Sequence, residues 1–491
     1  MRLSAHFRTQ ASPGRRSLRL ERSPAEKRCD NSNVMKMPLQ VAIMAAGEGK
    51  RMRSARPKAL HRLAGSPLLS HVLRAVRAIE PRAICVVYGS GGDQVPAAVP
   101  GADLIWARQE ALLGTGDALK CALQNLPKDG VTLAMIGDIP LIRSETLSRL
   151  AAAVDGDKLA VLTATPADPS GLGRIVRDGS GRVRAILEEK DASPEQRTIG
   201  EINAGVLAAP TGRFAQWLAR LTSDNAQGEY YLTDVVSLAV GDGVPVVAVS
   251  ASDPMEVQGV NDRAQLAAAE RALQRRAAQT LMHDGVTLAD PERIDVRGTL
   301  SCGKDVAIDI NCIFEGAVTL GDSVSIGAHC LLNNVRIGAG SVVAPFSHLE
   351  DAEIGGRCRI GPYSRIRPAS VLGDEVHIGN FVEVKASTIG TRSKANHLAY
   401  LGDASVGRDV NVGAGTITCN YDGANKHRTV IEDDVHIGSD TQLIAPVTVR
   451  KGATIGAGAT ISREVPAGEL TISQNKQVTV PGWKRPVKAR H

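Results

Sequence analysis

The chain has 491 residues, which is too long for a single core of the usual size, so two or three domains are expected. No apolar run approaches the ~18 residues that a membrane-spanning helix needs. The formal net charge of +6 suggests nucleic-acid binding until it is located along the chain. Residues 1–36 hold nine Lys/Arg and three acidic residues, which leaves 49 of the 58 basic and 49 of the 52 acidic residues in a neutral remainder. This distribution argues against a nucleic-acid binder.

The leader, residues 1–36, is rich in Arg and Ser and lacks the apolar segment of a secretory signal. A transit peptide shares part of this pattern, and so does translated upstream sequence before a start at Met35 or Met37. We favour a disordered segment or a misassigned start, because a strand is predicted almost directly after Met37. The eight cysteines are scattered, without C-x-x-C pairs or zinc-ligand spacing, which predicts free thiols in a reducing cytoplasm.

Residues 37–262 alternate short β-rich runs with helical ones. The expected strands are 41–47, 83–89, 131–138, 160–165 and 246–251, and the expected helices are 68–79, 116–126 and 144–154. Continuous apolar strands between amphipathic helices predict a Rossmann-like α/β domain, whose mostly parallel sheet is covered on both faces. Ligands of such sheets bind outside the carboxyl ends of the strands.

A connecting helix is predicted at residues 263–284. This segment is rich in Ala, contains neither Gly nor Pro, and stops at Gly285. The sequence before this helix alternates predicted strands and helices, whereas the sequence after it is repetitive. The expected domains are therefore 37–262 and 285–491.

The C-terminal domain repeats an aliphatic-Gly pair, as in SIGAH, RIGAG and HIGNF. These pairs fall at intervals of six residues or close to 18. A six-residue unit with three units per coil is typical of a left-handed parallel β-helix, for which about nine coils are expected. The interval from 412 to 437 exceeds one coil, so TITCNYDGANKHRTV is expected to carry an inserted loop. Such insertions usually lie on the binding face of a solenoid.

A glycine-rich, basic loop follows the first strand. Gly47 and Gly49 allow close approach of backbone N–H groups to phosphates, and Arg51 and Lys58 supply positive charge. Alone, this pattern is equally typical of an ordinary βα turn. Asp138 ends another strand, where its carboxylate could hold Mg²⁺ on a triphosphate, although a strand-end Asp is more often a cap or turn residue. Together the two elements favour nucleotidyl transfer.

Several motifs, taken in chain order, resemble the bifunctional GlmU family. They are the loop after the first strand, PKAL, RQEALLGTGDA, GDIPL, GRIV, EEKDAS, EINAGV, NAQGEYYLTD and GVNDR, followed by the β-helix repeats. The match runs from about residue 39 to the end. Members are UDP-N-acetylglucosamine diphosphorylase and glucosamine-1-phosphate N-acetyltransferase in one chain. The resemblance implies acetyl-CoA-dependent acetylation of glucosamine-1-phosphate in the C-terminal domain, then uridylyl transfer from UTP in the N-terminal domain. The product, UDP-N-acetylglucosamine, supplies peptidoglycan and lipopolysaccharide synthesis.

The resemblance also implies a nucleotide-sugar site in the N-terminal domain. Its residues are Met44, Ala45, Ala46, Gly47, Arg51 and Lys58 at the phosphates, Gln109, Gly114 and Thr115 at the uracil, Gly173, Glu188 and Asn203 at the sugar, and Asp138 and Asn261 at Mg²⁺. An N-acetylglucosamine-1-phosphate oxygen would attack the α-phosphate of UTP in line and release pyrophosphate. Positioning and charge neutralisation suffice for this reaction, and no protein nucleophile is needed.

Three positions in this domain depart from the family pattern. Lys50 stands where a small hydroxyl residue is usual, Ala204 replaces a Thr, and Ile136 replaces an aromatic residue. None of these changes removes a charge or a metal ligand. We therefore expect them to alter affinity more than the type of reaction.

The segment 393–403, SKANHLAYLGD, raises the question of a histidine in a repeating coil. From spacing alone, His397 is more often a surface or corner histidine. Arg367 and Lys385 could grip a sugar phosphate, and a histidine with a pKa near ~6.5 is a natural general base. The resemblance implies that His397 removes the proton of the sugar amine. It assigns the acetyl acceptor to Arg367, Lys385, Tyr400 and Asn411.

The resemblance assigns acetyl-CoA to a further set of residues. They are Ala414, Asn420, Tyr421, Ser439, Ala457 and Gln474. Asn420 and Tyr421 fall in the expected inserted loop. Gln474 stands where the family often has a basic residue, so cofactor affinity is expected to be weaker unless another Lys substitutes.

The implied partners are small molecules and a second copy of the chain. They are glucosamine-1-phosphate, N-acetylglucosamine-1-phosphate, UTP, acetyl-CoA, Mg²⁺ and a homotrimer formed through the β-helix, with neither nucleic acid nor membrane. The alternative is a sugar-phosphate nucleotidyltransferase with a single activity, whose β-helix only assembles or regulates. A pure scaffold has no reason to hold Arg367, Lys385 and His397 together, so this group distinguishes the two hypotheses.

Overall fold

The computed structural model describes residues 37–89, 91–473 and 479–484. The leader 1–36 and Gln474 lie outside these described residues. Among the residues that are described, no helix is long and apolar enough to cross a membrane.

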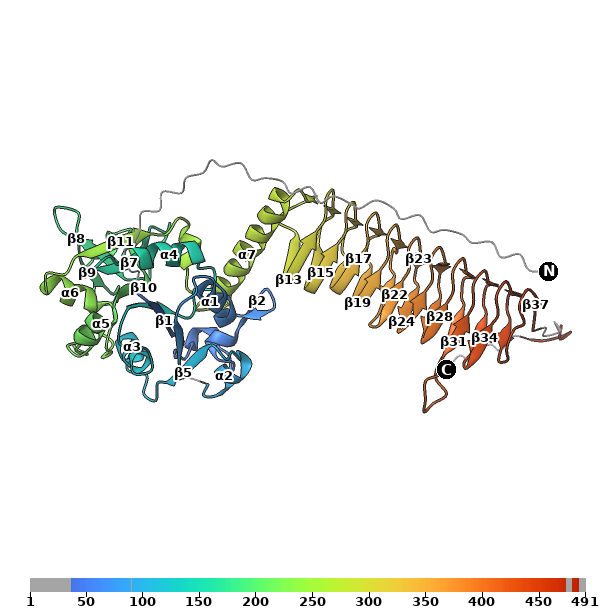
Figure 1. Ribbon diagram of the computed structural model, residues 1–491, viewed down its shortest axis with the longest axis horizontal. Coiled ribbons are helices and arrows are strands. Elements are labelled where there is room, and N and C mark those ends of the chain that lie inside the picture. Colours follow the sequence, from blue (N-terminus) through green and yellow to red (C-terminus); the bar gives the residue numbers. More distant parts are fainter. Residues whose placement is uncertain (1–36, 90, 474–478, 485–491) are drawn as a thin grey trace, which may run out of the picture. The chain divides into compact units, whose positions relative to one another are not determined.

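The N-terminal domain is built on a nine-stranded sheet (Figure 1). Its main path runs β11 (Val246–Ser250), β7 (Leu159–Ala164), β10 (Ile202–Pro210), β6 (Val131–Ile136), β1 (Leu39–Met44), β4 (Ala83–Tyr88) and β5 (Leu104–Arg108), while β8 (Arg174–Arg177) and β9 (Val183–Leu187) form a hairpin beside β10. The four pairs β1–β4, β1–β6, β4–β5 and β7–β11 are parallel. The predicted, mostly parallel sheet is therefore confirmed.

Strand β10 is antiparallel to both of its neighbours, β6 and β7. We did not predict it. Its sequence, INAGVLAAP, consists largely of small residues and includes a Gly and a Pro, which are depleted in strands. Burial on both sides, and not β propensity, holds it in the sheet.

Helices cover both faces of this sheet. They are α1 (Leu68–Arg77), α2 (Gln94–Ala98), α3 (Thr115–Leu123), α4 (Ser144–Ala152), α5 (Thr211–Leu218) and α6 (Asp234–Gly241), and a short hairpin joins β2 (Arg62–Leu63) to β3 (Ser66–Pro67). Alternate residues of β1 point to opposite faces. Val41 and Ile43 belong to the core beneath α1 and α4, and Ala42 and Met44 to the core beneath α3, α5 and α6. Burial of both faces explains why the strands read as continuous apolar runs.

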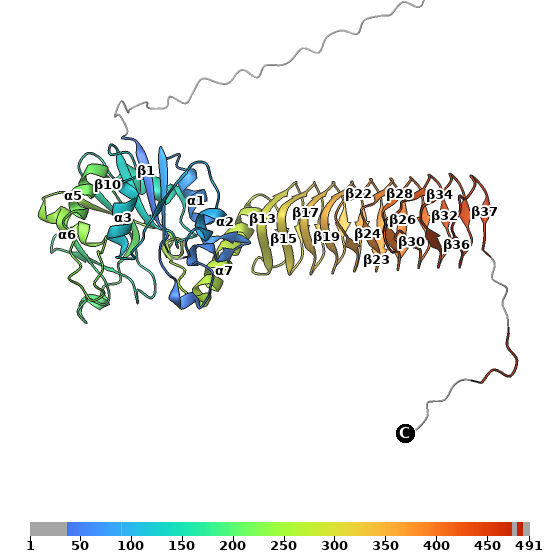
Figure 2. The same ribbon diagram turned by 90° about the horizontal axis from the view of Figure 1, so that it is seen from below.

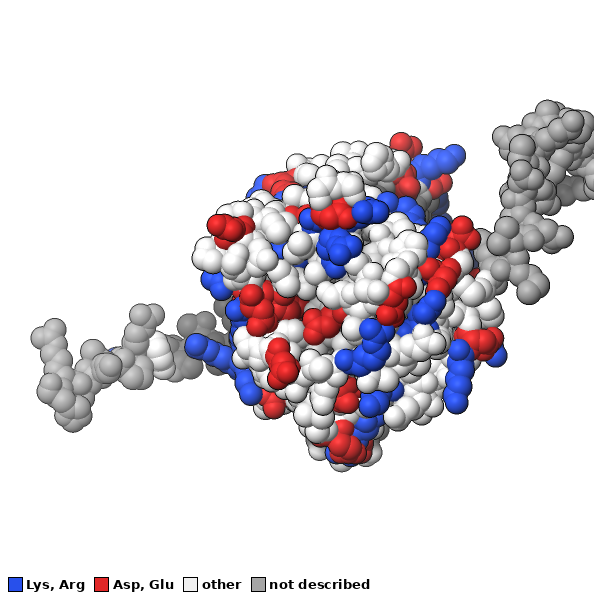
Figure 3. Space-filling model, turned by 90° about the vertical axis from the view of Figure 1, so that its left-hand side faces the viewer, with Lys and Arg blue, Asp and Glu red and all other residues white. Residues whose placement is uncertain are grey.

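Charged side chains are interspersed on the face of the N-terminal domain drawn in Figure 3. Many form ion pairs between elements that are distant in sequence, such as Arg177 with Glu201 and Arg220 with Asp242. This mixture agrees with the neutral balance of residues 37–491.

Helix α7 (Arg263–His283) follows the N-terminal domain. Asp262 caps it by accepting a hydrogen bond from the Gln265 N–H at 2.8 Å, and Gly285 follows its end with a φ of 93°. Gln274 exchanges two hydrogen bonds with the backbone of Val296, and Arg276 donates to the Leu141 carbonyl at 2.7 Å. The helix therefore makes polar contacts with both domains.

The C-terminal domain is a left-handed parallel β-helix with stacked coils (Figures 1 and 2). One sheet holds eleven strands: β12 (Thr287–Leu288), β14 (Ala307–Ile308), β16 (Ser325–Ile326), β18 (Val342–Val343), β20 (Arg359–Ile360), β23 (His377–Asn380), β26 (Lys394–His397), β29 (Asn411–Val412), β32 (His436–Ile437), β35 (Thr454–Ile455) and β37 (Leu470–Thr471). Neighbouring strands pair at intervals close to 18 residues, as in Ser325 with Val342 and Arg359 with His377. The predicted fold class is confirmed.

The remaining strands of the β-helix join in a fifteen-stranded sheet. Its long first strands are β13 (Ile294–Cys302), β15 (Cys312–Leu320), β17 (Leu331–Ile337) and β19 (His348–Ile354). Beyond β19 it divides into two faces, formed by β21 (Arg365–Ile366), β24 (Glu383–Lys385), β27 (Tyr400–Gly402), β30 (Ile417–Cys419), β33 (Gln442–Ile444) and β36 (Thr460–Ile461), and by β22 (Ser370–Leu372), β25 (Thr388–Ile389), β28 (Ala404–Val406), β31 (Thr429–Ile431) and β34 (Val447–Val449). Each of these later coils therefore has three short strands.

Two expectations about the coils have different outcomes. The estimate of about nine coils was too low, because the eleven-stranded sheet begins at Thr287, in a coil without the aliphatic-Gly pair used for counting. The inserted loop is confirmed. Asn411 pairs with His436, an interval of 25 residues, and Tyr421 bridges Lys426 within the extra segment.

Candidate active sites

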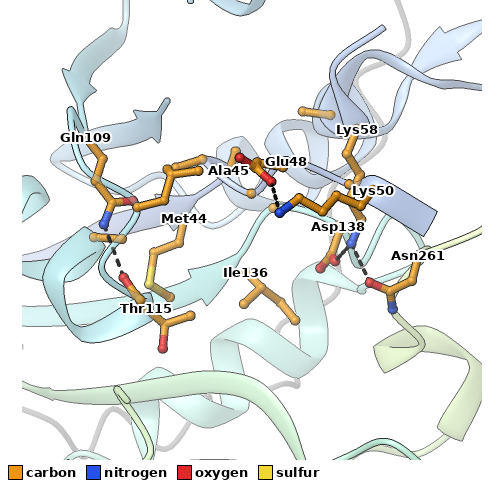
Figure 4. A pocket seen from close by; sticks show the side chains of 18 of the residues that line it. Met44, Ala45, Glu48, Lys50, Lys58, Gln109, Thr115, Ile136, Asp138 and Asn261 are labelled. Carbon is orange, nitrogen blue, oxygen red and sulfur yellow. Dashed lines mark hydrogen bonds and ion pairs between the residues drawn. The ribbon is translucent and has the colours of Figure 1, made fainter. Parts of the chain in front are cut away.

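A pocket of about 540 Å³ opens at the carboxyl ends of β1, β5 and β6 (Figure 4). It collects residues of the predicted nucleotide-sugar site from several segments. These are Met44, Ala45, Ala46, Gly47, Arg51, Lys58, Gln109, Gly114, Thr115, Asp138 and Asn261. The position agrees with the edge of the sheet where ligands of such folds bind.

The loop after β1 bends sharply beside the pocket. Gly49 has a φ of 65°, in the left-handed region that favours glycine, and the short helix η1 (Lys50–Met52) follows it. A Cβ at Gly49 would lie 2.8 Å from the Lys58 Cβ, which is closer than real Cβ contacts allow. The absence of a side chain at Gly49 therefore fixes how near the stem of Lys58 can pack.

Three polar side chains converge at one end of the pocket (Figure 4). Lys58 opens the short helix η2 (Lys58–Leu60), and its Nζ donates to Asp138 Oδ2 and, at 2.6 Å, to Asn261 Oδ1. The side chains of Lys58 and Asp138 are only 14% and 20% exposed. The other carboxylate oxygen, Asp138 Oδ1, is buried and has no hydrogen-bond partner among the described residues.

Asp138 and Asn261 fit a hard divalent cation. They offer carboxylate and amide oxygens from two loops, and Asp138 Oδ1 is an acceptor left without a donor. Magnesium usually takes one or two protein oxygens and completes its octahedron with water and phosphate oxygens. Two protein ligands at the side of an open pocket therefore match its preference.

The opposite end of the pocket is set by the start of α3. Gln109 is buried, and its Nε2 donates to the Gly114 carbonyl at 3.2 Å and to Asp117 at 2.7 Å. Thr115 Oγ1 accepts from the Leu232 N–H at 3.1 Å, which ties α3 to the following loop. Glu229 also lines the pocket and was missed by our sequence analysis. It lies within the motif NAQGEYYLTD, whose presence was the available signal.

The three residues predicted at the sugar form a separate group and do not line this pocket. The Asn203 N–H donates to the Gly173 carbonyl at 2.8 Å, and a Cβ at Gly173 would lie 3.5 Å from Glu188 Oε1. Thr233 donates to Glu188 at 3.2 Å. Burial raises the pKa of Glu188 above its usual value, opposed by the bond from Thr233, and the nearby Asp234 adds to the rise.

The departures from the family pattern occupy ordinary environments. Lys50 forms an ion pair with Glu48 at 2.7 Å, and that bond raises the pKa of Lys50. Ile136 packs against Gly205, where a Cβ would meet its side chain at 2.6 Å, and Ala204 is buried. The two apolar changes are thus part of the packing at the carboxyl end of β6.

In the β-helix, four of the predicted residues, Arg367, Lys385, Tyr400 and Asn420, form two side-chain hydrogen-bonded sets on neighbouring coils of the fifteen-stranded sheet. Arg367 pairs with Glu383 at 2.7 Å, and Lys385 pairs with Asp403 at 3.4 Å. Asn420, from the inserted loop, donates to Asp403 at 2.5 Å and lies 3.4 Å from the Tyr400 hydroxyl. The group is rich in cations and donors, and it is partly exposed.

His397 lies around the corner of the coil, at the end of β26 in the eleven-stranded sheet. Its Nδ1 and Asn380 Oδ1 are 2.8 Å apart, and Asn380 is its register partner in β23. An amide oxygen can only accept, so we assign the proton to Nδ1, which leaves the Nε2 lone pair free to take a proton. Our sequence analysis missed Asn380. Its signal is the coil interval of 17 residues.

The structure does not bring Asn411 into this group within one chain. Asn411 pairs with Lys394 on the eleven-stranded sheet and lines a separate hollow of about 410 Å³ with Arg392, Asp409 and His436.

Three of the residues predicted at acetyl-CoA, Ala414, Ser439 and Ala457, share one corner of successive coils. The register of β26, β29, β32 and β35 puts His397, Ala414, Ser439 and Ala457 at equivalent positions. Backbone hydrogen bonds link these coils, as from Asp440 N–H to the Ala414 carbonyl at 2.7 Å. The corner is therefore lined by small side chains, and His397 occupies the same position in the coil that precedes Ala414.

The chain is similar to known protein families and to curated proteins. A family described as MobA-like NTP transferase domain matches residues 41–283, the GMPPB C-terminal domain matches 296–397, and six bacterial transferase hexapeptide repeats match 428–463. "Bifunctional protein GlmU" of Aromatoleum aromaticum is 58% identical over 92% of this chain and 99% of its own. This chain belongs to the bifunctional GlmU family. The proteins of the same name from Chromobacterium violaceum and Nitrosospira multiformis are 57% and 58% identical, covering 92% of this chain and 99% and 98% of theirs. As a member of this family, the chain is an enzyme that carries two transferase domains.

Proposed function

We propose that the chain makes UDP-N-acetylglucosamine in two steps. The β-helix transfers the acetyl group of acetyl-CoA to the amine of glucosamine-1-phosphate, and the N-terminal domain transfers a uridylyl group from UTP to the product. Membership of the GlmU family over 92% of the chain supports both activities. For the N-terminal site, the observation that carries the assignment is the convergence of Lys58, Asp138 and Asn261 in one pocket.

In the N-terminal pocket, the loop 44–51 would bind the phosphates and the start of α3 the uracil. Gln109 and Thr115 hold that end in place, so the α-phosphate is positioned for in-line attack. Asp138 and Asn261 would hold Mg²⁺, which supplies charge neutralisation on the phosphates when bound. Lys58 and Arg51 would add positive charge at the phosphate oxygens. Gly173, Glu188 and Asn203 would contact the sugar from their own group.

In the β-helix, His397 would act as the general base. Asn380 keeps the proton on Nδ1, so Nε2 can take a proton from the sugar amine as the amine attacks the thioester carbonyl. Arg367 and Lys385 would hold the sugar phosphate, and Tyr400 and Asn411 its hydroxyls and amine. The corner of Ala414, Ser439 and Ala457, with Asn420 and Tyr421 of the inserted loop and Gln474, would bind acetyl-CoA.

Self-association as a homotrimer is supported by a row of four ring side chains and one leucine on the β-helix, here called the aromatic row. It consists of His329, Phe346, Tyr363, Phe381 and Leu398, at equivalent corner positions of successive coils. The ring centroids of the first four lie 4.9, 5.0 and 5.4 Å apart, and from Phe346 to Leu398 the residues are 47% to 62% exposed in one chain. Exposed aromatic side chains in a continuous row are typical of a protein interface.

The same proposal covers domain limits and compartment. We assign residues 37–262 to uridylyl transfer, 263–284 to the linker and 285–491 to acetyl transfer. A cytoplasmic location is supported by the seven cysteines of the described part of the chain, all of which are free thiols.

Two separate assays on one preparation test the function. Acetyl-CoA consumption with glucosamine-1-phosphate reports the first step, and pyrophosphate release from UTP with N-acetylglucosamine-1-phosphate reports the second. We expect both. Pyrophosphate release without acetyl transfer would favour the alternative in which the β-helix is only a scaffold.

A further inference from the structure

We propose that Lys58 occupies the cation position of the N-terminal site before the nucleotide arrives, and leaves it when metal and nucleotide bind together. The proposal rests on the function proposed above. Its basis is that the Lys58 ammonium donates to Asp138 Oδ2 and Asn261 Oδ1, and so lies between the two side chains that would hold the metal. A divalent cation and an ammonium cannot both occupy that position, so one must replace the other.

Burial makes this occupation favourable. The side chains of Lys58 and Asp138 are 14% and 20% exposed, and a charge in such surroundings needs a partner more than one in water does. Asp138 Oδ1 already lacks a donor among the described residues. Without the ammonium, no cation among the described residues would pair with this carboxylate.

The aliphatic part of the Lys58 side chain packs against the loop at Gly49, while its ammonium group contacts Asp138 and Asn261. A Cβ at Gly49 would lie within 2.8 to 3.5 Å of Lys58 Cβ, Cγ and Cδ, so the loop packs along this stem. Lys50, another cation of the pocket, is turned to Glu48 and is 85% exposed. Lys58 therefore has a fixed base close to the phosphate loop, and a change at its terminal torsions can carry Nζ from the two oxygens to a phosphate.

Coupled binding follows from this exchange. Metal alone must compete with Lys58 and binds weakly. A polyphosphate offers Lys58 a second anionic partner, which frees Asp138 and Asn261 for the metal that accompanies it. Each ligand thereby strengthens the binding of the other, as reciprocal coupling requires.

Metal binding without nucleotide tests the exchange. Mn²⁺ alone would be titrated into the full chain, with free Mn²⁺ followed by electron paramagnetic resonance. We expect Lys58→Met to bind Mn²⁺ at least ~10-fold more tightly than the unchanged protein. The reason is that Lys58 competes with the metal, and removing a competing interaction worth about 1.4 kcal/mol raises affinity tenfold. Lys58→Gln, which removes the charge but keeps a polar side chain that is one bond shorter, is expected to show the same direction.

Two controls locate the effect. Lys50→Met removes a pocket lysine that does not touch the two oxygens, and should leave Mn²⁺ affinity unchanged. Adding Asp138→Asn to Lys58→Met should abolish the gain. The proposal is overturned if both Lys58 variants bind Mn²⁺ no more tightly than the unchanged protein, or if Lys50→Met gains as much. Thermal unfolding of each variant, followed by circular dichroism, reports folding, and a missing UTP reaction in the unchanged protein would instead contradict the proposed function.

Discussion

The two candidate sites are built in opposite ways. In the N-terminal domain, loops that follow β1, β5 and β6 turn inward over one edge of a sheet, and their residues share a single pocket. On the β-helix, the proposed residues lie on the outside of stacked coils, with Arg367, Lys385 and Tyr400 on one sheet and His397 and Asn411 on the other. One chain therefore encloses the first site but presents the second as an open surface. A convex solenoid needs a second surface, from a loop or from another copy, to enclose a ligand.

The largest expected effect separates the two sites at His397. We expect His397→Ala to lower acetyl transfer by about 10²- to 10⁴-fold, the usual contribution of a general base, and to leave uridylyl transfer unchanged. Both rates would be measured on one preparation. His377→Ala, in the preceding coil, is the matched control and should retain acetyl transfer. A fall in both activities of His397→Ala would contradict independent sites.

The aromatic row tests whether the open site needs another copy. Phe381→Ser removes a ring that is 57% exposed in one chain. If this ring is buried between copies, the loss of ~1.5–3 kcal/mol weakens association about 10- to 100-fold. Light scattering over a dilution series would measure this, and acetyl transfer should fall with dilution while uridylyl transfer does not. Val371→Ser changes an apolar residue that is 43% exposed and lies on another face. Equal dissociation of both variants would argue against the row as the interface.

A smaller effect is expected where the enclosed site depends on a glycine. Gly49→Ala adds a side chain at a φ of 65°, which costs about 1–2 kcal/mol, and displaces Lys58. We expect the KM for UTP to rise roughly 10-fold, with acetyl transfer unchanged. Gly92→Ala introduces similar strain, at a φ of 55°, where a Cβ meets nothing within 4 Å. It should destabilise without the change in KM. The same KM change in both variants would show that displacement of Lys58 is not the cause.

The smallest effect concerns cysteines within the coils. Burial raises the pKa of Cys330 to about 12 and that of Cys312 to about 11. At pH 8 both thiols should resist a thiol reagent until the chain is unfolded, whereas the partly exposed Cys419 should react sooner. Rapid labelling of Cys330 in the folded protein would contradict this expectation.

The same shift makes stability depend on pH. A thiol whose folded pKa is raised binds its proton more tightly than in the unfolded chain, so its contribution is present below the ordinary pKa and is lost above it. The denaturation midpoint should therefore fall between about pH 8.5 and 12. Cys330→Ala, measured across the same range, should reduce that fall.

Sequence alone predicted the parts of this protein whose signal is local or periodic. The apolar runs of β1, β4, β6 and β7 and the coil interval of the β-helix were sufficient for both fold classes, because burial on both faces and stacking at a fixed spacing each impose a regular pattern on the residues. The inserted loop was visible as a break in that interval. The family resemblance supplied the individual site residues, and the structure gathers most of those in the N-terminal domain into one pocket.

Only the tertiary structure decided what these residues face. Strand β10 is held by burial and not by β propensity, so its small residues gave no strand signal. Asn380 and His397 are 17 residues apart in sequence but adjacent in space, because one coil brings the chain back to the same corner. Lys58, Asp138 and Asn261 come from three separate segments, and their meeting depends on how the loops fold over the edge of the sheet. The family resemblance implies a phosphate-binding lysine and two metal ligands, but only the packing shows that this lysine contacts both of the other side chains.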